Sequence, residues 1–250
     1  MDRTEKCEKK FGKLFGGKPT VSEGSDPEFM RILQRFIFGE VSYTGSLDDR
    51  MRELITVTVL TVYQTLPQLK AHTAACLNIG VTPVEIRETV YRCAPFIGFP
   101  KTLNAIAAIN EVFTEKGITL PLENCETVTE SDRYEKGLAL QAPVYGTEIA
   151  ERYEWLPEEF SRAVPRFLTE LCFSDFMTRR GQDEKTSEPL TVVMLAAIGG
   201  ADLQVRSHVE GALKVGCTKE EIVCALVCAM PYTGFPRLFN ALNCSKELLS

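Results

Sequence analysis

Apolar residues recur three and four positions apart along most of the chain, which is the spacing of one face of an α-helix. A first run lies between residues 27 and 40, with apolar side chains at Phe29, Ile32, Leu33, Phe36 and Ile37. A second run, residues 46–64, is charged in its first turns and apolar afterwards, which is typical of a helix that enters the core. Alternation with a period of two never lasts beyond a few residues. The pattern therefore predicts an all-α protein.

Capping and helix-breaking residues divide this pattern into shorter helices. We expect one helix over residues 3–15 and another over residues 68–78, which stops before a glycine. The sequence Thr-Pro-Val-Glu at residues 82–85 is a capping box with proline in the first turn, so a further helix begins there. Ser46 is the expected N-cap of the helix over residues 46–64.

The helical pattern occurs twice. A shift of 136 positions aligns residues 68–105 with residues 204–241, with 13 identities in 38 positions and no gap. The chain has two histidines, His72 and His208, and they fall at the same place in this unit. Self-similarity of this kind indicates a tandem duplication.

Weaker similarities extend the duplication toward the N-terminus of each half. Residues 3–16 resemble residues 133–146 at an offset of 130, and residues 28–35 resemble residues 159–166 at an offset of 131. We therefore predict a first repeat over residues 1–128 and a second over residues 129–250. The change of offset leaves five extra residues in the second half, which we expect in the loop around residues 174–182.

Composition and charge narrow the classes of function. The net charge is −6, and Lys/Arg runs never exceed two residues, which argues against nucleic acid as a partner. An apolar run of 18 residues is missing, so we expect no membrane span, and the polar first ten residues do not form a signal peptide. The nine cysteines are scattered without a CxxC motif, which is typical of free thiols in a cytoplasmic protein.

The histidines are the first candidates for chemistry, because an imidazole exchanges a proton near neutral pH. We interpret His72 and His208 as catalytic acid/base residues, and Glu53 as the carboxylate that pairs with His72. In a simple antiparallel hairpin Glu53 and His72 lie about 8 Å out of level at roughly 1.5 Å rise per residue. A direct contact would need a large crossing angle, a bridging water or a second subunit, and Glu53 as a solvated helix residue stays an alternative.

The second half lacks an acid at the matching position. The residue 136 positions after Glu53 is Pro189, although Glu188 directly precedes it. The pair is thus expected intact only in the first half, which is the first place to look for activity. Several basic residues could hold an anionic substrate: Arg50, Arg52, Lys70, Lys101, Arg206 and Arg237. The two distant histidines and the missing CxxC make a metal improbable, and dinucleotide or phosphate-loop motifs do not occur, so we expect no cofactor.

The most distinctive residues of the two halves lie in five segments: LDDRMRELIT (47–56), HTAACLNIGVTPVEI (72–86), PFIGFPKTLNA (95–105), HVEGALKVGCTKEEI (208–222) and PYTGFPRLFNAL (231–242). Together they resemble the carboxymuconolactone decarboxylase family, in the superfamily of alkylhydroperoxidase D-like proteins. The resemblance implies a helical fold whose subunits form trimers or hexamers. A tandem version is expected to form a homo-trimer that mimics the hexamer.

The resemblance also bears on activity. The redox branch of the superfamily uses a glutamate, a CxxC and a histidine, and its cysteine positions here are Thr65 and Gln68 in the first half. The decarboxylase branch lacks these cysteines and implies a cofactor-independent lyase of aromatic catabolism, acting on a small unsaturated carboxylic acid or lactone. Two alternatives stay open: a thiol-dependent peroxidase that uses the scattered cysteines (a peroxiredoxin activity), and a non-catalytic binding or assembly module.

Overall fold

A computed structural model describes residues 1–20, 24–147 and 149–250, and every regular element in these ranges is helical, as predicted. The first half contains α1 (Arg3–Phe15), α2 (Pro27–Gly39), the 3₁₀ turn η1 (Val41–Tyr43), α3 (Asp49–Tyr63), α4 (Leu66–Asn78), α5 (Pro83–Tyr91), α6 (Ala94–Ile97) and α7 (Phe99–Glu115). The second half contains α8 (Arg133–Tyr145), α9 (Ile149–Arg152), α10 (Glu158–Phe167), the π-helix η2 (Leu168–Met177), α11 (Glu184–Ile198), α12 (Asp202–Lys214), α13 (Lys219–Thr233), α14 (Phe235–Cys244) and α15 (Lys246–Leu249).

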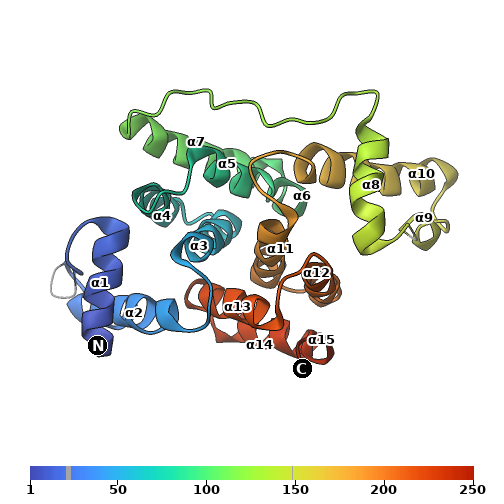
Figure 1. Ribbon diagram of the computed structural model, residues 1–250. Helices are drawn as coiled ribbons and strands as arrows, with labels where there is room; N and C mark the ends of the chain where they lie inside the picture. The colour runs from blue at the N-terminus through green and yellow to red at the C-terminus, as the bar shows by residue number, and fades with distance from the viewer. Residues whose placement is uncertain (21–23, 148) are drawn as a thin grey trace.

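Helices α3 and α11 lie side by side at the centre of the molecule (Figure 1). Helix α3 packs on α4, α5 and α13, and α11 packs on α12, α13 and α3. The α1–α2 hairpin lies at one end, and α8 with α10 lies at the opposite end (Figure 1). The repeats therefore meet through equivalent helices and carry their N-terminal hairpins outward.

The two halves share one hydrophobic core. Leu54 and Ile55 of α3 are fully buried in the same apolar cluster as Val192 and Val193 of α11. At roughly 25 cal/mol per Å² of apolar surface, burial of this kind is the main favourable term in folding. Each repeat thus completes the core of the other.

The central helices begin at matching caps. Asp48 accepts a hydrogen bond from the Met51 amide at 2.8 Å, and Asp183 accepts one from the Thr186 amide at 2.8 Å. The N-cap of α3 is therefore Asp48 and not Ser46. The helix begins at Asp49, so the Asp48 side chain lies next to the free amides of the first turn. The predicted capping box at Thr82 is confirmed, and Thr218 forms its counterpart.

Four of the five extra residues of the second half precede α11, where a loop covers residues 178–183 only, and the fifth lies in the turn at residues 199–201. The chain from Glu158 continues as one helical rod through η2 to Met177, and η2 is a π-helix. A π-helix bonds each residue to the fifth one along and so holds extra residues in wider turns. The predicted loop is therefore shorter than expected, because residues 174–177 complete this helix.

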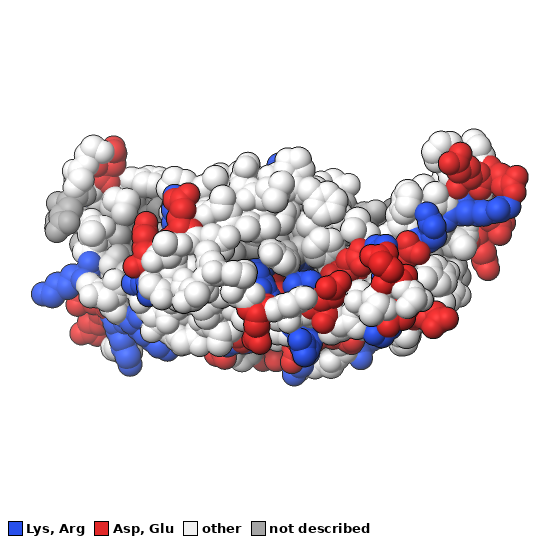
Figure 2. Space-filling model, turned by 90° about the horizontal axis from the view of Figure 1, so that it is seen from above, with Lys and Arg blue, Asp and Glu red and all other residues white. Residues whose placement is uncertain are grey.

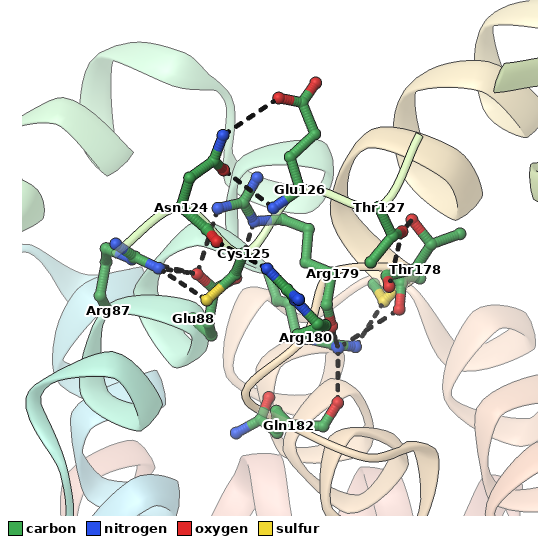
Figure 3. Close-up of polar contacts among 12 residues, drawn as sticks. Arg87, Glu88, Asn124, Cys125, Glu126, Thr127, Thr178, Arg179, Arg180 and Gln182 are labelled. Atoms are coloured by element: carbon green, nitrogen blue, oxygen red, sulfur yellow. Dashed lines mark hydrogen bonds and ion pairs between the residues drawn. The ribbon is translucent and has the colours of Figure 1, made fainter. Parts of the chain in front are cut away.

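A long connection, residues 116–132, spans the molecule between α7 and α8 (Figure 1). Figure 3 shows where residues 124–127 of this strap lie against residues 178–182. The Arg180 amide donates to the Cys125 carbonyl at 2.9 Å, and the Thr127 hydroxyl donates to the Thr178 carbonyl at 3.0 Å. Backbone and side-chain hydrogen bonds therefore hold the strap against the segment that precedes α11.

An ion-pair cluster fixes this junction (Figure 3). Glu88 is fully buried, and its carboxylate accepts hydrogen bonds from Arg87 Nη2 and Arg179 Nε, both at 2.7 Å. Arg87 also donates to the Glu123 carbonyl in the strap at 2.8 Å. A buried carboxylate needs such partners to offset its desolvation, so the cluster ties α5, the strap and the second half together.

Charge is unevenly spread over the surface. Figure 2 shows a broad uncharged area on one face, with charged side chains along one long edge and at both ends. Among the helices that the structure describes, none is long and apolar enough to cross a membrane.

Candidate active site

The first acid–histidine pair forms inside a single chain. His72 Nδ1 on α4 lies 2.7 Å from Glu53 Oε2 on α3, and both side chains are buried. The direct contact needs neither a bridging water nor a second subunit. The estimate of an 8 Å mismatch failed because it assumed a simple antiparallel hairpin of straight helices.

The pairing fixes the chemistry of the imidazole. An ionised carboxylate can only accept hydrogen bonds, so Nδ1 of His72 carries the proton that Glu53 accepts. Nε2 is then left to give or take a proton from a bound molecule. A carboxylate in this position also stabilises the imidazolium form.

The second half has a pair of its own, formed by the residue next to Pro189. His208 Nδ1 lies 3.0 Å from Glu188 Oε2. The expectation that the second half lacks an acid was therefore wrong. The second pair is also more open to solvent: the exposed fractions of the His208 and Glu188 side chains are 16% and 15%, against 10% and 6% for His72 and Glu53.

A one-residue difference in a turn hid the second acid. The turn between α3 and α4 has two residues, 64–65, and the turn between α11 and α12 has three, 199–201. Helix α11 therefore matches α3 at an offset of 135, while α12 matches α4 at 136. The shared N-cap aspartates, Asp48 and Asp183, lie at the offset of 135 and were the signal that could have revealed Glu188.

Tyr145 of α8 joins the second pair and was not predicted. Its hydroxyl lies 2.7 Å from both Glu188 Oε2 and His208 Nδ1. Burial, together with the charge of Glu188, raises the pKa of Tyr145 well above its usual value. The phenol therefore stays protonated at neutral pH and can donate to the carboxylate.

Gly211 makes room for this hydroxyl. A Cβ atom at Gly211 would lie 2.6 Å from the Tyr145 oxygen. The equivalent position in the first half is the fully buried Ala75, and the residue that matches Tyr145 there is Phe15. The first half thus has an alanine and a phenylalanine where the second half has a glycine and a tyrosine.

Each half also contributes an aromatic ring to the histidine of the other half. Tyr232 of α13 packs edge-on against His72, with ring centroids 5.8 Å apart. Phe96 of α6 packs in the same way against His208, at 5.9 Å. Tyr232 and Phe96 are repeat-equivalent, so both centres are built from the two halves together.

Four of the six basic residues considered as anion ligands have other partners. Lys70 forms an ion pair with Glu111, Arg206 with Glu247 and Arg50 with Glu85. Arg52 is buried and donates to loop carbonyl groups, among them Leu47 at 2.7 Å. Lys101 and Arg237 lie on α7 and α14, outside the two acid–histidine pairs.

The carboxymuconolactone decarboxylase family matches the chain twice, over residues 27–111 and 162–247. The two matches cover more than half of the chain. This chain belongs to the carboxymuconolactone decarboxylase family. Both acid–histidine pairs lie inside the matched ranges, whereas α1 and α8, which carry Phe15 and Tyr145, lie outside them.

Two decarboxylases are among the similar proteins. The 4-carboxymuconolactone decarboxylase of Acinetobacter baylyi is 34% identical over 91 residues, which are 36% of this chain and 68% of that protein. The nitrosuccinic acid decarboxylase npaB of Metarhizium robertsii is 27% identical over 84 residues, 34% of this chain and 59% of that protein. The matched segments thus correspond in length to one repeat and span about two thirds or less of these relatives.

A solved structure shares the fold over the whole length. A crystal structure described as a gamma-carboxymuconolactone decarboxylase subunit of Burkholderia xenovorans aligns with 99% of this chain and 98% of its own, with a TM-score of 0.53. The identity is 21%. The two-repeat helical architecture is therefore found in another member of this fold.

Neither half has a CxxC motif. The positions that the resemblance to the redox branch assigns to its cysteines are Thr65 and Gln68 in the first half and Ala201 and Gln204 in the second. All nine cysteines are free thiols, and burial raises the pKa of Cys93 to about 12 and that of Cys217 to about 11. Among the described residues, no three His, Cys, Asp or Glu side chains are grouped to hold a metal ion.

Proposed function

We propose that the protein is a cofactor-independent decarboxylase that acts on a small unsaturated carboxylic acid or lactone. The observation that carries the proposal is the buried contact between His72 and Glu53, repeated between His208 and Glu188. Membership of the family and the two decarboxylases among the relatives support the reaction class.

The pairs suit the proton transfer that such a reaction needs. When a carboxylate leaves as CO₂, the electron pair of the broken C–C bond moves into the conjugated system and forms an extended enolate. A proton must then be added at carbon, and an imidazolium can deliver it from Nε2 while its Nδ1–H stays bonded to the glutamate. Solvent returns the proton to the histidine, so the net reaction consumes one proton and releases one CO₂.

The test is the release of CO₂ from 4-carboxymuconolactone and from nitrosuccinic acid. We expect the wild type to release CO₂ from one of them or from a related unsaturated acid, and the double variant H72Q/H208Q to lose this activity. The double variant K70Q/R206Q is the matched control, because it changes two repeat-equivalent residues of α4 and α12 that form exposed ion pairs. Undiminished activity in H72Q/H208Q would contradict the proposal.

A thiol peroxidase is the second candidate, and one cluster favours it. Arg52 Nη1 lies 2.9 Å from Cys228 Sγ, and the two sulfur atoms of Cys224 and Cys228 are 4.0 Å apart. The hydrogen bond from Cys228, together with the charge of Arg52, lowers the pKa of Cys224 to about 6. A thiolate can attack a peroxide, release the alcohol or water and become a sulfenic acid, which a second thiol converts to a disulfide with loss of water.

Peroxide consumption with dithiothreitol as the reductant separates the two candidates. The peroxidase requires that the variant C224S/C228S, and one with all nine cysteines replaced by serine, lose the activity. A decarboxylase requires that both variants keep CO₂ release. Peroxide consumption that is the same in the wild type and in both variants would exclude the cysteines from the chemistry.

We also propose that the protein assembles with copies of itself, as a trimer. Repeat-equivalent apolar side chains are exposed on both halves: Phe99 and Phe235 are each 53% exposed, and Leu103 and Phe239 follow one turn later. In a ring of three chains, the apolar patch on one half of each chain can pack against the patch on the other half of its neighbour. Light scattering on the purified chain tests this, and a monomer at micromolar concentration would contradict it.

A further inference from the structure

A pocket with a volume of about 460 Å³ lies between α5, α7 and the strap. Arg179, from the segment that precedes α11, lines it as well. Neither His72 nor His208 lines it, and neither do their glutamates. A volume of this size is typical of a small-molecule site, and the pocket is separate from both acid–histidine pairs.

Two guanidinium groups in the wall of this pocket share a single carboxylate (Figure 3). The side chains of Arg87 and Arg179 are 10% and 14% exposed, and both donate to Glu88, which is 0% exposed. No other carboxylate lies within 4 Å of either guanidinium in the described part of the chain. The cluster therefore has one excess positive charge in a largely buried place, where an unbalanced charge is costly.

One of these guanidinium groups has donors left for a ligand. Both lie over the ring of Tyr91, with distances of 5.4 Å for Arg87 and 5.2 Å for Arg179 between the guanidinium carbon and the ring centroid. Nη1 of Arg87 donates to the Glu123 carbonyl at 2.8 Å. Arg179 uses Nε and Nη2 for Glu88, and its Nη1 has no hydrogen-bond partner among the described residues. The Arg179 Nη1 group thus offers its N–H donors to the pocket.

The rest of the wall combines polar groups with apolar surface. The Tyr91 hydroxyl and the side-chain amide of Asn110 form no hydrogen bond with any residue that the structure describes, and both residues line the pocket. Ile106 of α7 and Leu120 and Leu122 of the strap line it too. A few polar groups on an apolar wall are the usual composition of a site that orients a small organic molecule.

The equivalent helix of the second half has an apolar face at this place. At the offset of 136 that the two capping boxes share, Arg87 and Tyr91 of α5 correspond to Val223 and Val227 of α13. Helix α13 packs on α14 as α5 packs on α7. The packing of this helix pair thus needs neither the guanidinium nor the phenol, and the polar wall is a feature of the first half alone.

We propose that this pocket binds a monocarboxylate with a short hydrocarbon chain. The carboxylate accepts charge-assisted hydrogen bonds from Arg179 and balances the single excess charge. The hydrocarbon chain covers Ile106 and Leu122 and removes apolar surface from water. Inorganic phosphate fits less well, because it carries more charge and leaves the apolar wall uncovered.

The bound acid stabilises the junction between the two halves. Arg87 belongs to the first half, Arg179 to the second, and Leu120 and Leu122 to the strap that connects them. A ligand that binds only when these parts are together raises the melting temperature by mass action. Hydrogen exchange of the Arg180 amide, which donates to the strap, should also become slower.

Isothermal titration with hexanoate tests the site without any turnover. We expect the wild type to bind hexanoate, to bind acetate at least about tenfold more weakly and not to bind hexanamide, which has the same chain without the charge. R179Q should bind hexanoate at least about tenfold more weakly, the factor for a lost hydrogen bond to a charged group. N110F should do the same, because its ring fills the pocket while both arginines and Glu88 stay in place. Hexanoate should raise the melting temperature of the wild type and of neither variant.

The matched control is R180Q, which removes the next arginine along the chain. Arg180 donates to the Asn124 carbonyl at 3.0 Å and does not line the pocket, so R180Q should bind hexanoate within about twofold of the wild type. H72Q/H208Q should do so as well, because the pocket is separate from the histidines. Circular dichroism verifies that each variant is folded, and N110F tests the site even if R179Q is not.

Three results would overturn the site. The first is a wild type that does not bind hexanoate, or variants R179Q and N110F that bind it as well as the wild type does. The second is binding that H72Q/H208Q abolishes, since the acid would then lie at the acid–histidine pairs. The third is inorganic phosphate that binds more tightly than hexanoate, which would exclude the carboxylate as the ligand.

Discussion

The two histidine centres of this chain differ in what their N-terminal hairpins place beside the imidazole. In the first half, Phe15 lies edge-on to His72 at 5.5 Å, and Phe11 and Phe38 surround Phe15 at 4.8 and 5.5 Å. In the second half the matching residues are Tyr145, Gln141 and Thr169. An aromatic cluster closes one centre, whereas polar side chains accompany the other.

Gln141 and Thr169, the polar residues that match Phe11 and Phe38, form a hydrogen bond with each other. The Thr169 hydroxyl donates to the Gln141 side chain at 2.7 Å, and both residues are buried. Buried polar groups are tolerated only when they are paired in this way. The hairpin of the second half therefore keeps its packing without two of the three aromatic rings, and a cleft lies beside it.

The comparison teaches that both halves have the acid–histidine pair, whereas the residues around the pair differ between the halves. Both halves keep a glutamate, a histidine and a borrowed aromatic ring. Aromatic side chains fill the space beside the first pair, whereas the second pair has a tyrosine and, from the end of α5 in the first half, the buried guanidinium of Arg92 near it. We therefore expect the second half to carry most of the turnover, and four predictions test this view.

The largest effect should come from the histidines taken singly. H208Q should lower kcat by about 10²–10⁴-fold, the usual contribution of a general acid/base. H72Q should lower it by less than about tenfold, because the aromatic cluster limits access to His72. Steady-state CO₂ release of both variants measures this difference, and a larger loss in H72Q would reverse the assignment of the two halves.

The aromatic cluster should contribute more to stability than its polar counterpart. F38A should cost about 3–5 kcal/mol of unfolding free energy, the range for large buried side chains. T169A, at the equivalent position, should cost about 1–2 kcal/mol, because a single hydrogen bond and its buried partner are affected. Urea denaturation of the two variants measures the difference, and equal costs would show that the clusters do not differ in this way.

The effects of substitutions at Tyr145 and Gly211 should not be additive. Y145F should lower kcat by about tenfold to hundredfold, the value of a hydrogen bond to a charged group. G211A should also lower activity and stability, because its new Cβ meets the tyrosine oxygen at 2.6 Å. In the Y145F background that oxygen is absent, so G211A should cost less than it does alone.

The four members of this cycle are compared by melting temperature and kcat. A75G in the first half is the control, and it should cost about 1 kcal/mol through backbone freedom alone. Strictly additive effects of Y145F and G211A would show that the hydroxyl does not occupy the space beside the glycine.

The smallest effect should come from the caps of the central helices. D48A and D183A should each cost about 1 kcal/mol at pH 7. Hydrogen bonds from the Thr186 side chain and amide lower the pKa of Asp183 below its ordinary value of 3.8. Its contribution is therefore fully present above that value and is lost as the pH falls through the folded-state pKa.

Denaturation at pH 7 and at a series of pH values below 3.8 measures this dependence. The stability difference between the wild type and D183A should shrink as the acid is protonated. A difference that persists unchanged at the lowest pH at which the protein stays folded would contradict the role of the carboxylate.

Much of the fold could be predicted because it depends on local signals. Helical periodicity, the capping box at Thr82 and the glycine after α4 are read from neighbouring residues, and the structure confirms each of them. The pairing of Glu53 with His72 was also predictable as a pair of residue types. That the two side chains are in direct contact could not be predicted, because tertiary packing sets the angle at which α3 and α4 cross.

Glu188 and Tyr145 show why the rest of the site was harder to find. Glu188 was hidden by one extra residue in a turn, which an ungapped comparison cannot register. Tyr145 is 63 residues from His208 and lies on a helix whose similarity between the halves is weak. Arg92 lies 96 residues before Glu188, and their shared cavity arises only when α5 of one half meets α11 of the other.

The sequence by itself determined that this protein is a duplicated helical chain with a histidine in each half, because periodicity, caps and repeats are local properties. Only the tertiary structure decided which acid each histidine meets, which centre is closed by aromatic rings and which one is joined by a tyrosine. These features depend on how two copies of one pattern pack against each other. Packing joins residues far apart in the chain, and no spacing along the sequence records it.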